Sequence, residues 1–261
     1  MTSTHDAAPE ITAICRYPVK GLSADRVERT AVETGKCIAF DRAYAIENGG
    51  RSFDPFNPKY LSKSKFLMLM SHEKLATLDT RFDDETQILE VLRDGKQVAK
   101  GKLDDRTGCQ LLEQFFGAYM TDALRGAPRI VHATDHSFSD ASAQYLSLIN
   151  LASVRDLERV VGKPVDPMRF RGNIYVEGLD PWVEFDWIGR TVTTAGEASF
   201  RCAERIDRCA AINVDPSTGA RDMSIPRTLM QAFGHMDLGV FLEVTADGSI
   251  AVGDTLSPEP V

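Results

Sequence analysis

Closely spaced turn signals are the sequence feature that most constrains this chain. Asn48-Gly49-Gly50, Asp94-Gly95 and Asp247-Gly248 interrupt it, and the apolar segments between such turns are mostly short. Short apolar segments bounded by turns are typical of β-strands. The sequence has no repeat of fixed period and no low-complexity stretch. The spacing therefore predicts a mostly β fold with a few helices.

Individual elements follow from the local patterns. The pattern predicts strands at 11–16, 26–32, 37–47, 66–70, 129–134, 173–176, 188–194 and 198–205, and hairpins at 88–102 and 240–252. Apolar residues at helical spacing predict helices over 107–119, 151–161 and 226–233, with Asn150 as the N-cap of the second. A polar, proline-broken stretch at 51–60 predicts a long loop.

A change in composition suggests where the chain divides. The segment 121–128, which ends in Arg125-Gly126-Ala127-Pro128, separates two strand-rich halves. We predict two mixed but β-dominated domains with a few helices between them, at 10–124 and 125–258. A chain of 261 residues can bury a core without disulfide staples.

Composition excludes several classes of protein. Thirty Lys and Arg against thirty-eight Asp and Glu give a net charge of −8. This argues against a protein that coats nucleic acid or anionic membrane, yet it allows a local basic pocket. No apolar run approaches the roughly 20 residues of a membrane helix, and Met1–Glu10 lacks the features of a signal peptide. Five cysteines, an odd number, are expected to be thiols in a reducing cytoplasm.

Four short segments contain residues that are suited to chemistry. They are Tyr17-Pro18-Val19-Lys20-Gly21, Phe40-Asp41-Arg42, Arg169-Phe170-Arg171-Gly172-Asn173, and Arg208-Cys209 with the turn that follows. Each alone has a structural interpretation: a solvated turn lysine, a buried ion pair, an exposed basic rim or a core thiol. Taken together, they indicate a phosphorylated ligand held by Lys and Arg. A thiolate beside Arg208 would suit a soft metal on that ligand.

The order of six separated motifs resembles the MOSC family, which is named after the C-terminus of molybdenum cofactor sulfurase, preceded by the MOSC N-terminal β-barrel. The motifs are Tyr17-Pro18-Val19-Lys20, Asp41-Arg42, Phe170-Arg171-Gly172-Asn173-Ile174-Tyr175-Val176, Trp182-Val183-Glu184-Phe185-Asp186-Trp187-Ile188-Gly189, Arg208-Cys209 with Val214-Asp215-Pro216-Ser217-Thr218-Gly219, and 248–254. The resemblance covers about residues 10–257. It implies a MOSC N-terminal β-barrel-like domain at 10–124, followed by a MOSC β-barrel domain at 125–258.

The resemblance implies a molybdenum enzyme. Two-part MOSC proteins resemble the mitochondrial amidoxime-reducing component and its bacterial relatives, which bind the molybdenum cofactor (molybdopterin carrying the metal). By position, Cys209 matches the metal ligand and the catalytic centre. Cofactor contacts would come from Lys20, Arg42, Asn150, Arg171, Asn173 and Arg208, with Asn150 at a helix start that suits a phosphate. The implied enzyme reduces N-hydroxylated or other N-oxygenated small molecules.

This sequence departs from the family pattern at three places. A second cysteine often stands three residues before the ligand, and here Ile206 occupies that place, while Cys202 is expected in a strand or the core. The Thr-Ala-Arg type segment after the early strands is absent, and Lys63 or Lys65 is the candidate replacement for its charge. No cluster of four cysteines that would mark a fused ferredoxin-like domain is present, so electrons are expected from a separate protein.

Two other functions remain open from the sequence. One is a sulfur carrier that uses a persulfide on Cys209, and the other is a non-catalytic module that binds or stores the cofactor. Asp215 is considered as a general acid, although a plain turn explains it as well. A zinc site is not expected, because Cys202 and Cys209 are too far apart for a zinc knuckle.

Overall fold

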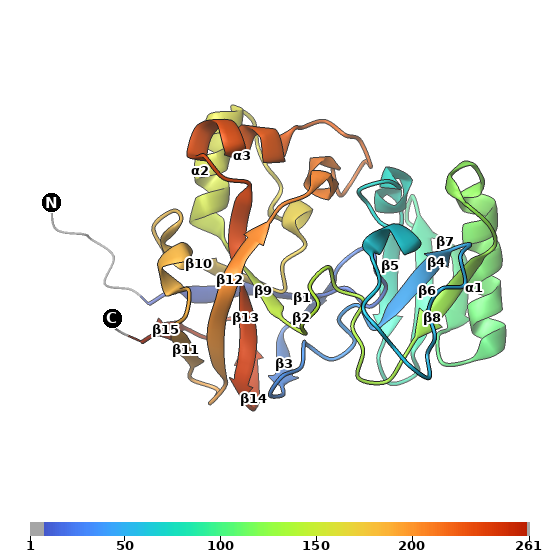
Figure 1. The fold of residues 1–261 in the computed structure, drawn as a ribbon, viewed down its shortest axis with the longest axis horizontal. Coiled ribbons are helices and arrows are strands. Elements are labelled where there is room, and N and C mark those ends of the chain that lie inside the picture. Colours follow the sequence, from blue (N-terminus) through green and yellow to red (C-terminus); the bar gives the residue numbers. More distant parts are fainter. Residues whose placement is uncertain (1–7, 260–261) are drawn as a thin grey trace, which may run out of the picture.

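The computed structural model describes residues 8–259 of the chain. The segment Met1–Glu10, which is predicted not to be a signal peptide, therefore lies mostly outside the described residues. Within them the fold is mostly β with three α-helices (Figure 1), which confirms the predicted fold class. The α-helices are α1 (Arg106–Tyr119), α2 (Leu151–Val161) and α3 (Ile225–Phe233). None of the helices in this part of the chain has both the length and the apolar character needed to cross a bilayer.

The strands are mostly short and are spread over the whole described chain. They are β1 (Glu10–Arg16), β2 (Asp25–Val27), β3 (Arg29–Val32), β4 (Tyr44–Asn48), β5 (Asp79–Asp83), β6 (Ile88–Arg93), β7 (Lys96–Lys102), β8 (Pro128–His132), β9 (Leu146–Asn150), β10 (Ile174–Glu177), β11 (Thr191–Thr194), β12 (Ser199–Asp207), β13 (Asp237–Ala246), β14 (Gly248–Ala251) and β15 (Leu256–Pro258). Short 3-10 helices connect several of them: η1 (Lys63–Lys65), η2 (Glu73–Thr77), η3 (Thr121–Ala123), η4 (Pro167–Phe170), η5 (Val183–Trp187) and η6 (Ala210–Asn213).

An eight-stranded sheet forms the larger body of the molecule. Its order is β15-β11-β12-β13-β9-β10-β1-β2, and alternate side chains of its strands fill a buried apolar core. The sheet curls until Ile11 N donates to Asp254 O at 2.8 Å. Gly253 N also donates to Ile11 O and Leu256 N donates to Pro9 O, both at 2.8 Å, and Glu10 and Thr255 form an isolated bridge. The expected barrel is not closed, because these contacts do not extend into a strand ladder between β1 and β15.

The first strands of the chain join this larger sheet. β1 pairs with β10, β2 pairs with β1, and β3 pairs with β14. Ile11, Ile14 and Val32 consequently belong to the same apolar core as β9–β13. The division of the chain at residue 124 stays a prediction, and strands from both sides of it share one sheet.

The smaller body lies on the right of Figure 1 and contains two separate sheets. β4 pairs with β8, and β5, β6 and β7 form a three-stranded sheet beside α1. Residues 49–78 between β4 and β5 contribute only the isolated bridge Glu47–Phe66. This proline-containing segment supplies no strand to link the two sheets, so the expected N-terminal barrel is open.

Several predicted elements are confirmed. The hairpin at 88–102 forms β6 and β7, and the amphipathic helix forms α1, which buries Leu112 and Phe116. Asn150 caps α2 as predicted, since its side chain accepts a hydrogen bond from Ala152 N. α2 and α3 cover one end of the large sheet and pack over a second apolar cluster.

Three predicted elements are wrong. Residues 37–43 form turns rather than a strand, because the Asp41 carboxylate accepts a hydrogen bond from Tyr17 N at 2.8 Å and Phe40 and Arg42 adopt positive φ. Of residues 66–70, only Phe66 takes part in a β-bridge. The strand prediction failed here because a short apolar run does not by itself distinguish a strand from a buried turn. The C-terminal hairpin does not form, because β14 leaves β13 and pairs with β3.

Candidate functional site

A cavity of about 440 Å³ lies where the large sheet meets the smaller body, within the usual size range of ligand pockets. Its walls come from the segment after β1, from η1, from the loop before β9, from η4 and from the loop after β12. Six of the seven predicted site residues line it: Lys20, Arg42, Arg171, Asn173, Arg208 and Cys209. The structure thus brings together residues up to 189 positions apart in the sequence.

One wall is built by the strand end around Asn173. Its Oδ1 accepts hydrogen bonds from Ser147 N at 3.0 Å and Ser147 Oγ at 2.9 Å, and its Nδ2 donates to Cys15 O at 3.0 Å. A side chain at the preceding Gly172 would place Cβ 2.3 Å from Ile149, so only glycine fits there. Asn173 therefore lines the cavity while its amide fixes three strands relative to one another.

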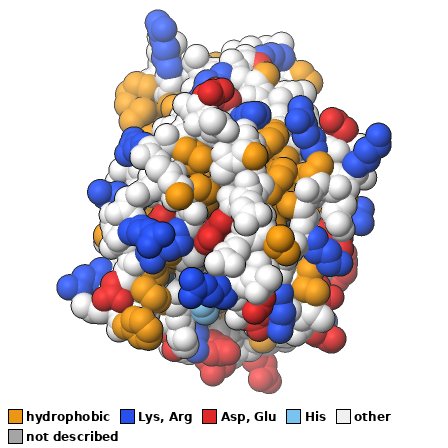
Figure 2. All heavy atoms as spheres, turned by 90° about the vertical axis from the view of Figure 1, so that its right-hand side faces the viewer, with side chains coloured by type: hydrophobic (Ala, Val, Ile, Leu, Met, Phe, Trp, Pro, Cys, Tyr) orange, Lys and Arg blue, Asp and Glu red, His pale blue; other side chains and the backbone are white. Residues whose placement is uncertain are grey.

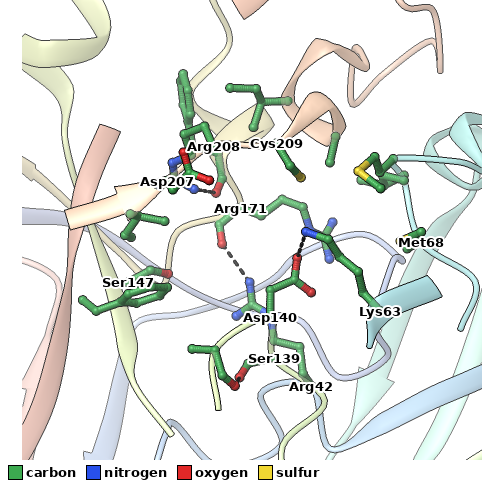
Figure 3. A pocket seen from close by; sticks show the side chains of 18 of the residues that line it. Arg42, Lys63, Met68, Ser139, Asp140, Ser147, Arg171, Asp207, Arg208 and Cys209 are labelled. Carbon is green, nitrogen blue, oxygen red and sulfur yellow. Dashed lines mark hydrogen bonds and ion pairs between the residues drawn. The ribbon is translucent and has the colours of Figure 1, made fainter. Parts of the chain in front are cut away.

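Two guanidinium groups enclose the Tyr17 ring behind this wall. The Arg42 and Arg171 groups lie 4.4 Å and 4.2 Å from the ring centroid. Arg42 Nη2 donates to Arg171 O at 2.8 Å, and Arg171 Nη1 donates to Leu22 O at 2.8 Å (Figure 3 draws the first of these bonds). Burial lowers the pKa of Arg171 and raises the pKa of Tyr17. Both arginines have φ near +50°, so the backbone is held in a conformation that L residues seldom adopt.

Asp140 joins two lysines at the cavity. Lys20 Nζ donates to Asp140 Oδ1 and to Phe138 O at 2.7 Å, and Lys63 Nζ donates to Asp140 Oδ2 at 2.8 Å (Figure 3). Burial lowers the pKa of Lys20. Burial alone would raise the pKa of Asp140, but the two ammonium groups outweigh it and lower that pKa. Lys63 is the replacement charge expected from the sequence. Asp140 was not expected, because no local sequence pattern relates its loop to Lys20 and Lys63, which lie 120 and 77 positions away.

Cys209 is half-buried and lies at the start of η6. Figure 3 shows its sulfur pointing into the space bordered by Arg171 and Lys63. Burial opposes the charged form of Lys63, but Asp140 and then Cys209 raise the pKa of that ammonium. Lys63 and Cys209 both line the cavity. Ile206 also lines the cavity, and Cys202 is fully buried in β12, which confirms its assignment to the core.

Arg208 precedes Cys209 but binds backbone oxygens. Its Nε donates to Leu238 O at 2.8 Å, its Nη1 donates to Phe170 O at 3.0 Å, and its Nη2 also donates to Leu238 O. Burial lowers its pKa to about 10. Arg208 thus anchors the start of the Cys209 loop while its charge remains close to the thiol.

Asn150 is not among the residues that line the cavity, so the structure does not bring it together with the other predicted site residues. It is 0% exposed, and its Nδ2 donates to Asp180 O at 2.9 Å and to Glu184 Oε2 at 2.7 Å. Its Oδ1 accepts from Ala152 N at 2.9 Å. All its polar atoms are used in capping α2 and holding Glu184, so the side chain serves the fold.

Asp215 closes the turn that follows η6. Its Oδ1 accepts hydrogen bonds from Ser217 N and Thr218 N, both at 2.9 Å. Burial opposes the charged carboxylate, yet these bonds and the Ser217 hydroxyl lower its pKa to about 2. A carboxyl group that is ionised at neutral pH is a poor proton donor, so the turn interpretation accounts for this residue.

The cavity is positive although the chain is acidic. Seven Lys and Arg and three Asp and Glu line it, an excess of four positive charges, whereas the whole chain carries −8. Figure 2 shows that basic and acidic side chains are interspersed on the face of the smaller body. The positive charge is therefore gathered in a confined site, which suits one phosphorylated ligand better than a polyanion.

Within residues 8–259, no group of three or more His, Cys, Asp or Glu side chains is placed to hold a metal ion. A metal at Cys209 would thus take most of its ligands from an organic cofactor. The thiol and the surrounding cations fit such a group, since a soft metal prefers sulfur and Arg and Lys bind phosphate.

Comparison with known proteins agrees with this site. The family model described as "MOSC domain" matches residues 133–257. Molybdenum cofactor sulfurase of Anopheles gambiae is 35% identical over 145 residues, which are 50% of this chain and 18% of that protein. Molybdenum cofactor sulfurase 1 of Aedes aegypti is 27% identical over 274 residues (92% and 34%). Mitochondrial amidoxime reducing component 2 of Homo sapiens is 26% identical over 144 residues (50% and 42%).

The chain spans less than half the length of each of these relatives. Among solved structures, the YuaD protein from Bacillus subtilis has a TM-score of 0.45 and 11% identity over 96% of this chain and 94% of that one. The sequence match, with Arg171, Asn173 and Cys209 inside it, confirms the predicted family at the domain level. Residues 133–257 of this chain match the MOSC domain model.

Proposed function

We propose that the cavity binds a molybdenum cofactor and that Cys209 contacts its metal. The observation that carries this proposal is that the Cys209 thiol lines the same cavity as seven Lys and Arg and three Asp and Glu side chains, an excess of four positive charges. The names of the relatives, molybdenum cofactor sulfurase and amidoxime reducing component, support the same cofactor.

The cationic residues divide into two groups by their freedom to bind. Arg42 and Arg208 each donate several N–H groups to protein oxygens, and Arg171 donates one to Leu22 O, so they shape the wall and supply charge. Lys20 and Lys63 share Asp140 and keep donors for a ligand, because an ammonium has three. We assign the phosphate of the cofactor to the side of the cavity that these two lysines form.

The proposed reaction is the reduction of N-hydroxylated or other N-oxygenated small molecules. The cofactor, when bound, supplies the chemistry that removes oxygen from the N–O bond, with electrons from a separate donor protein. This chain's residues bind the cofactor, orient it through Cys209 and limit the access of water. No described carboxyl group is assigned as a proton donor, since Asp215 is held ionised in its turn.

We expect this activity in the cytoplasm. All five cysteines are free in the structure, and two of them, Cys15 and Cys202, are buried. Burial raises the pKa of Cys15 to about 11 and that of Cys202 to about 12. Such thiols are inert core residues, and a reducing compartment keeps Cys209 available.

Metal content is the test of the proposal. The full chain is purified from a host that makes the cofactor, as wild type, as Cys209→Ala and as Cys109→Ala. Cys109 is a matched control because it is also half-buried but lies on α1, where its thiol donates to Leu103 O at 3.3 Å. We expect about one molybdenum per chain in the wild type and in the control, and little in Cys209→Ala. Equal molybdenum in all three proteins would contradict the assignment of Cys209.

The relatives that are named sulfurases favour a second candidate, a sulfur carrier. In that case Cys209 would hold a persulfide, which mass spectrometry detects as one added sulfur atom on its peptide. A persulfide without stoichiometric molybdenum would support this function in place of the first. Bound molybdenum without turnover of any N-hydroxylated compound, given a suitable donor, would indicate a cofactor carrier.

A further inference from the structure

Two arginine side chains hold the loop that carries Cys209, together with the buried Ile212 and the contact between Lys163 and Asp222. It runs from Cys209 to Ser224, between β12 and α3, and its own regular structure is η6 and the isolated bridge Val214–Arg221. A loop without a strand ladder has few backbone bonds to fix its position, so side-chain contacts determine where the thiol lies.

Arg169 holds the loop from the side of the large sheet. Its side chain is 2% exposed and forms ion pairs with Asp215 at 3.0 Å and Asp222 at 2.9 Å. Its Nη1 also donates to Asn213 O at 3.2 Å. η4, which carries Arg169, is followed directly by its C-cap Arg171 in the cavity wall, so this contact ties the loop to the wall beside it.

Arg221 holds the loop from the opposite side. Its Nη1 donates to Ala210 O, next to Cys209, at 3.2 Å. Its Nη2 donates to Leu69 O at 3.0 Å, to Met70 O at 2.6 Å and to Glu73 Oε2 at 3.1 Å. Leu69 and Met70 belong to the cavity wall that the smaller body supplies. One guanidinium group thus spans from the residue after the thiol to the wall across from the large sheet.

We infer that Arg221 is a positioning residue that sets the width of the cavity at Cys209. The inference rests on the proposed function only in treating Cys209 as the reactive residue. A planar guanidinium donates in several fixed directions at once, which the single ammonium of lysine does not reproduce. Without Arg221, the loop keeps its attachment through Arg169 but loses its attachment to Leu69 and Met70, so the cavity should open at the thiol.

The test measures access to Cys209 in the full chain without cofactor. Cys209 is alkylated by iodoacetamide and by a bulky maleimide in parallel, and each rate is measured by mass spectrometry. Trypsin cuts after Arg208, and Cys209 is the sole cysteine up to Arg227, so its peptide is unambiguous in every variant. Both reagents attack the thiolate, and therefore the ratio of the two rates reports the width of the cavity and not the ionisation of the thiol.

The variants are Arg221→Gln, Arg221→Lys and the control Arg227→Gln, which removes an exposed arginine from α3 in the same region. We expect the maleimide-to-iodoacetamide ratio to rise about threefold to tenfold in Arg221→Gln, the range for losing a modest set of hydrogen bonds. The lysine variant should fall between it and the wild type, and the control should not change.

An unchanged ratio in a folded Arg221→Gln protein would overturn the inference, as would an equal rise in Arg227→Gln. If Arg221→Gln does not fold, the lysine variant decides, since it keeps the charge, and an unchanged ratio there would overturn the inference. The measurement needs no molybdenum, so a wild-type protein that binds no metal would remove the proposed function while leaving this result interpretable.

Discussion

The two walls of the cavity that flank Cys209 and Asn173 are built in different ways. The Asn173 wall consists of strand ends joined by buried amide and hydroxyl hydrogen bonds, with Ser147 and Cys15 as partners. The Cys209 wall is a loop held by the ion pairs and carbonyl contacts of Arg169 and Arg221. Buried, fully paired networks are costly to break, whereas partly exposed charged contacts contribute little each. The first wall should therefore govern folding, and the second should govern access to the thiol.

The largest expected effect is that of Asn173→Ala on the rigid wall. The substitution leaves Ser147 N and Cys15 O buried without their side-chain partner. Each such group costs about 1–3 kcal/mol, so we expect a loss of about 3 kcal/mol in the free energy of unfolding, measured with urea. Asn57→Ala, in the exposed 51–60 loop, is the control and should stay within about 0.5 kcal/mol. A loss below about 1 kcal/mol in Asn173→Ala would contradict the assigned rigidity.

A smaller loss is expected for Arg169→Met on the loop wall. The side chain is 2% exposed, but its partners Asp215 and Asp222 are 24% and 34% exposed and can be rehydrated. We therefore expect the free energy of unfolding to fall by about 2 kcal/mol, which is less than the roughly 3–5 kcal/mol lost when one partner of a fully buried ion pair is removed. Arg201→Met removes an exposed pair with Glu243 and should change stability by less than about 1 kcal/mol. An Arg169 effect larger than that of Asn173→Ala would reverse the contrast between the walls.

Asp140→Asn tests the carboxylate that links the two lysines. A carboxyl group whose pKa is lowered in the folded state stabilises the folded protein at any pH above its ordinary pKa of about 4. That stabilisation is lost as the pH falls below this value. The Asp140 side chain is 49% exposed. We therefore expect the free energy of unfolding of the wild type, measured with urea at pH 7, to exceed that of the variant by less than about 1 kcal/mol. The difference should shrink as the pH falls below about 4. A difference that grows on acidification would show that the lysines do not lower the pKa of Asp140.

The smallest effect is expected for Lys63→Gln. Lys63 is 29% exposed and is one of seven cationic side chains in the cavity. We expect about threefold weaker binding of inorganic phosphate by calorimetry, since an exposed ion pair is worth less than about 1 kcal/mol. Lys65→Gln, two residues away and exposed outside the cavity, should bind like the wild type. Equal weakening in both variants would indicate a general charge effect.

The same contrast explains what the sequence could predict. The motifs around Lys20 and Arg171 were found because each lies beside a strand pattern, and Arg42 was found because Asp41-Arg42 is a charged pair within an apolar stretch. Asp140 and Arg221 were not found, since their partners lie 120 and about 150 positions away and no local pattern marks such contacts. The position of Asn150 away from the cavity was not foreseen, because the same residue type both caps helices and contacts ligands. The open sheets were missed because strand patterns do not specify how the ends of a sheet meet.

Protection of Cys209 from alkylation tests the central claim most directly. The chain is prepared from a host that makes the molybdenum cofactor and from one that does not, and iodoacetamide labelling of each cysteine peptide is followed. The cofactor site predicts that labelling of Cys209 falls in proportion to the molybdenum content, while labelling of Cys109 on α1 is the same in both preparations. Equal labelling of Cys209 at high and low molybdenum content would contradict the claim that this thiol contacts the metal.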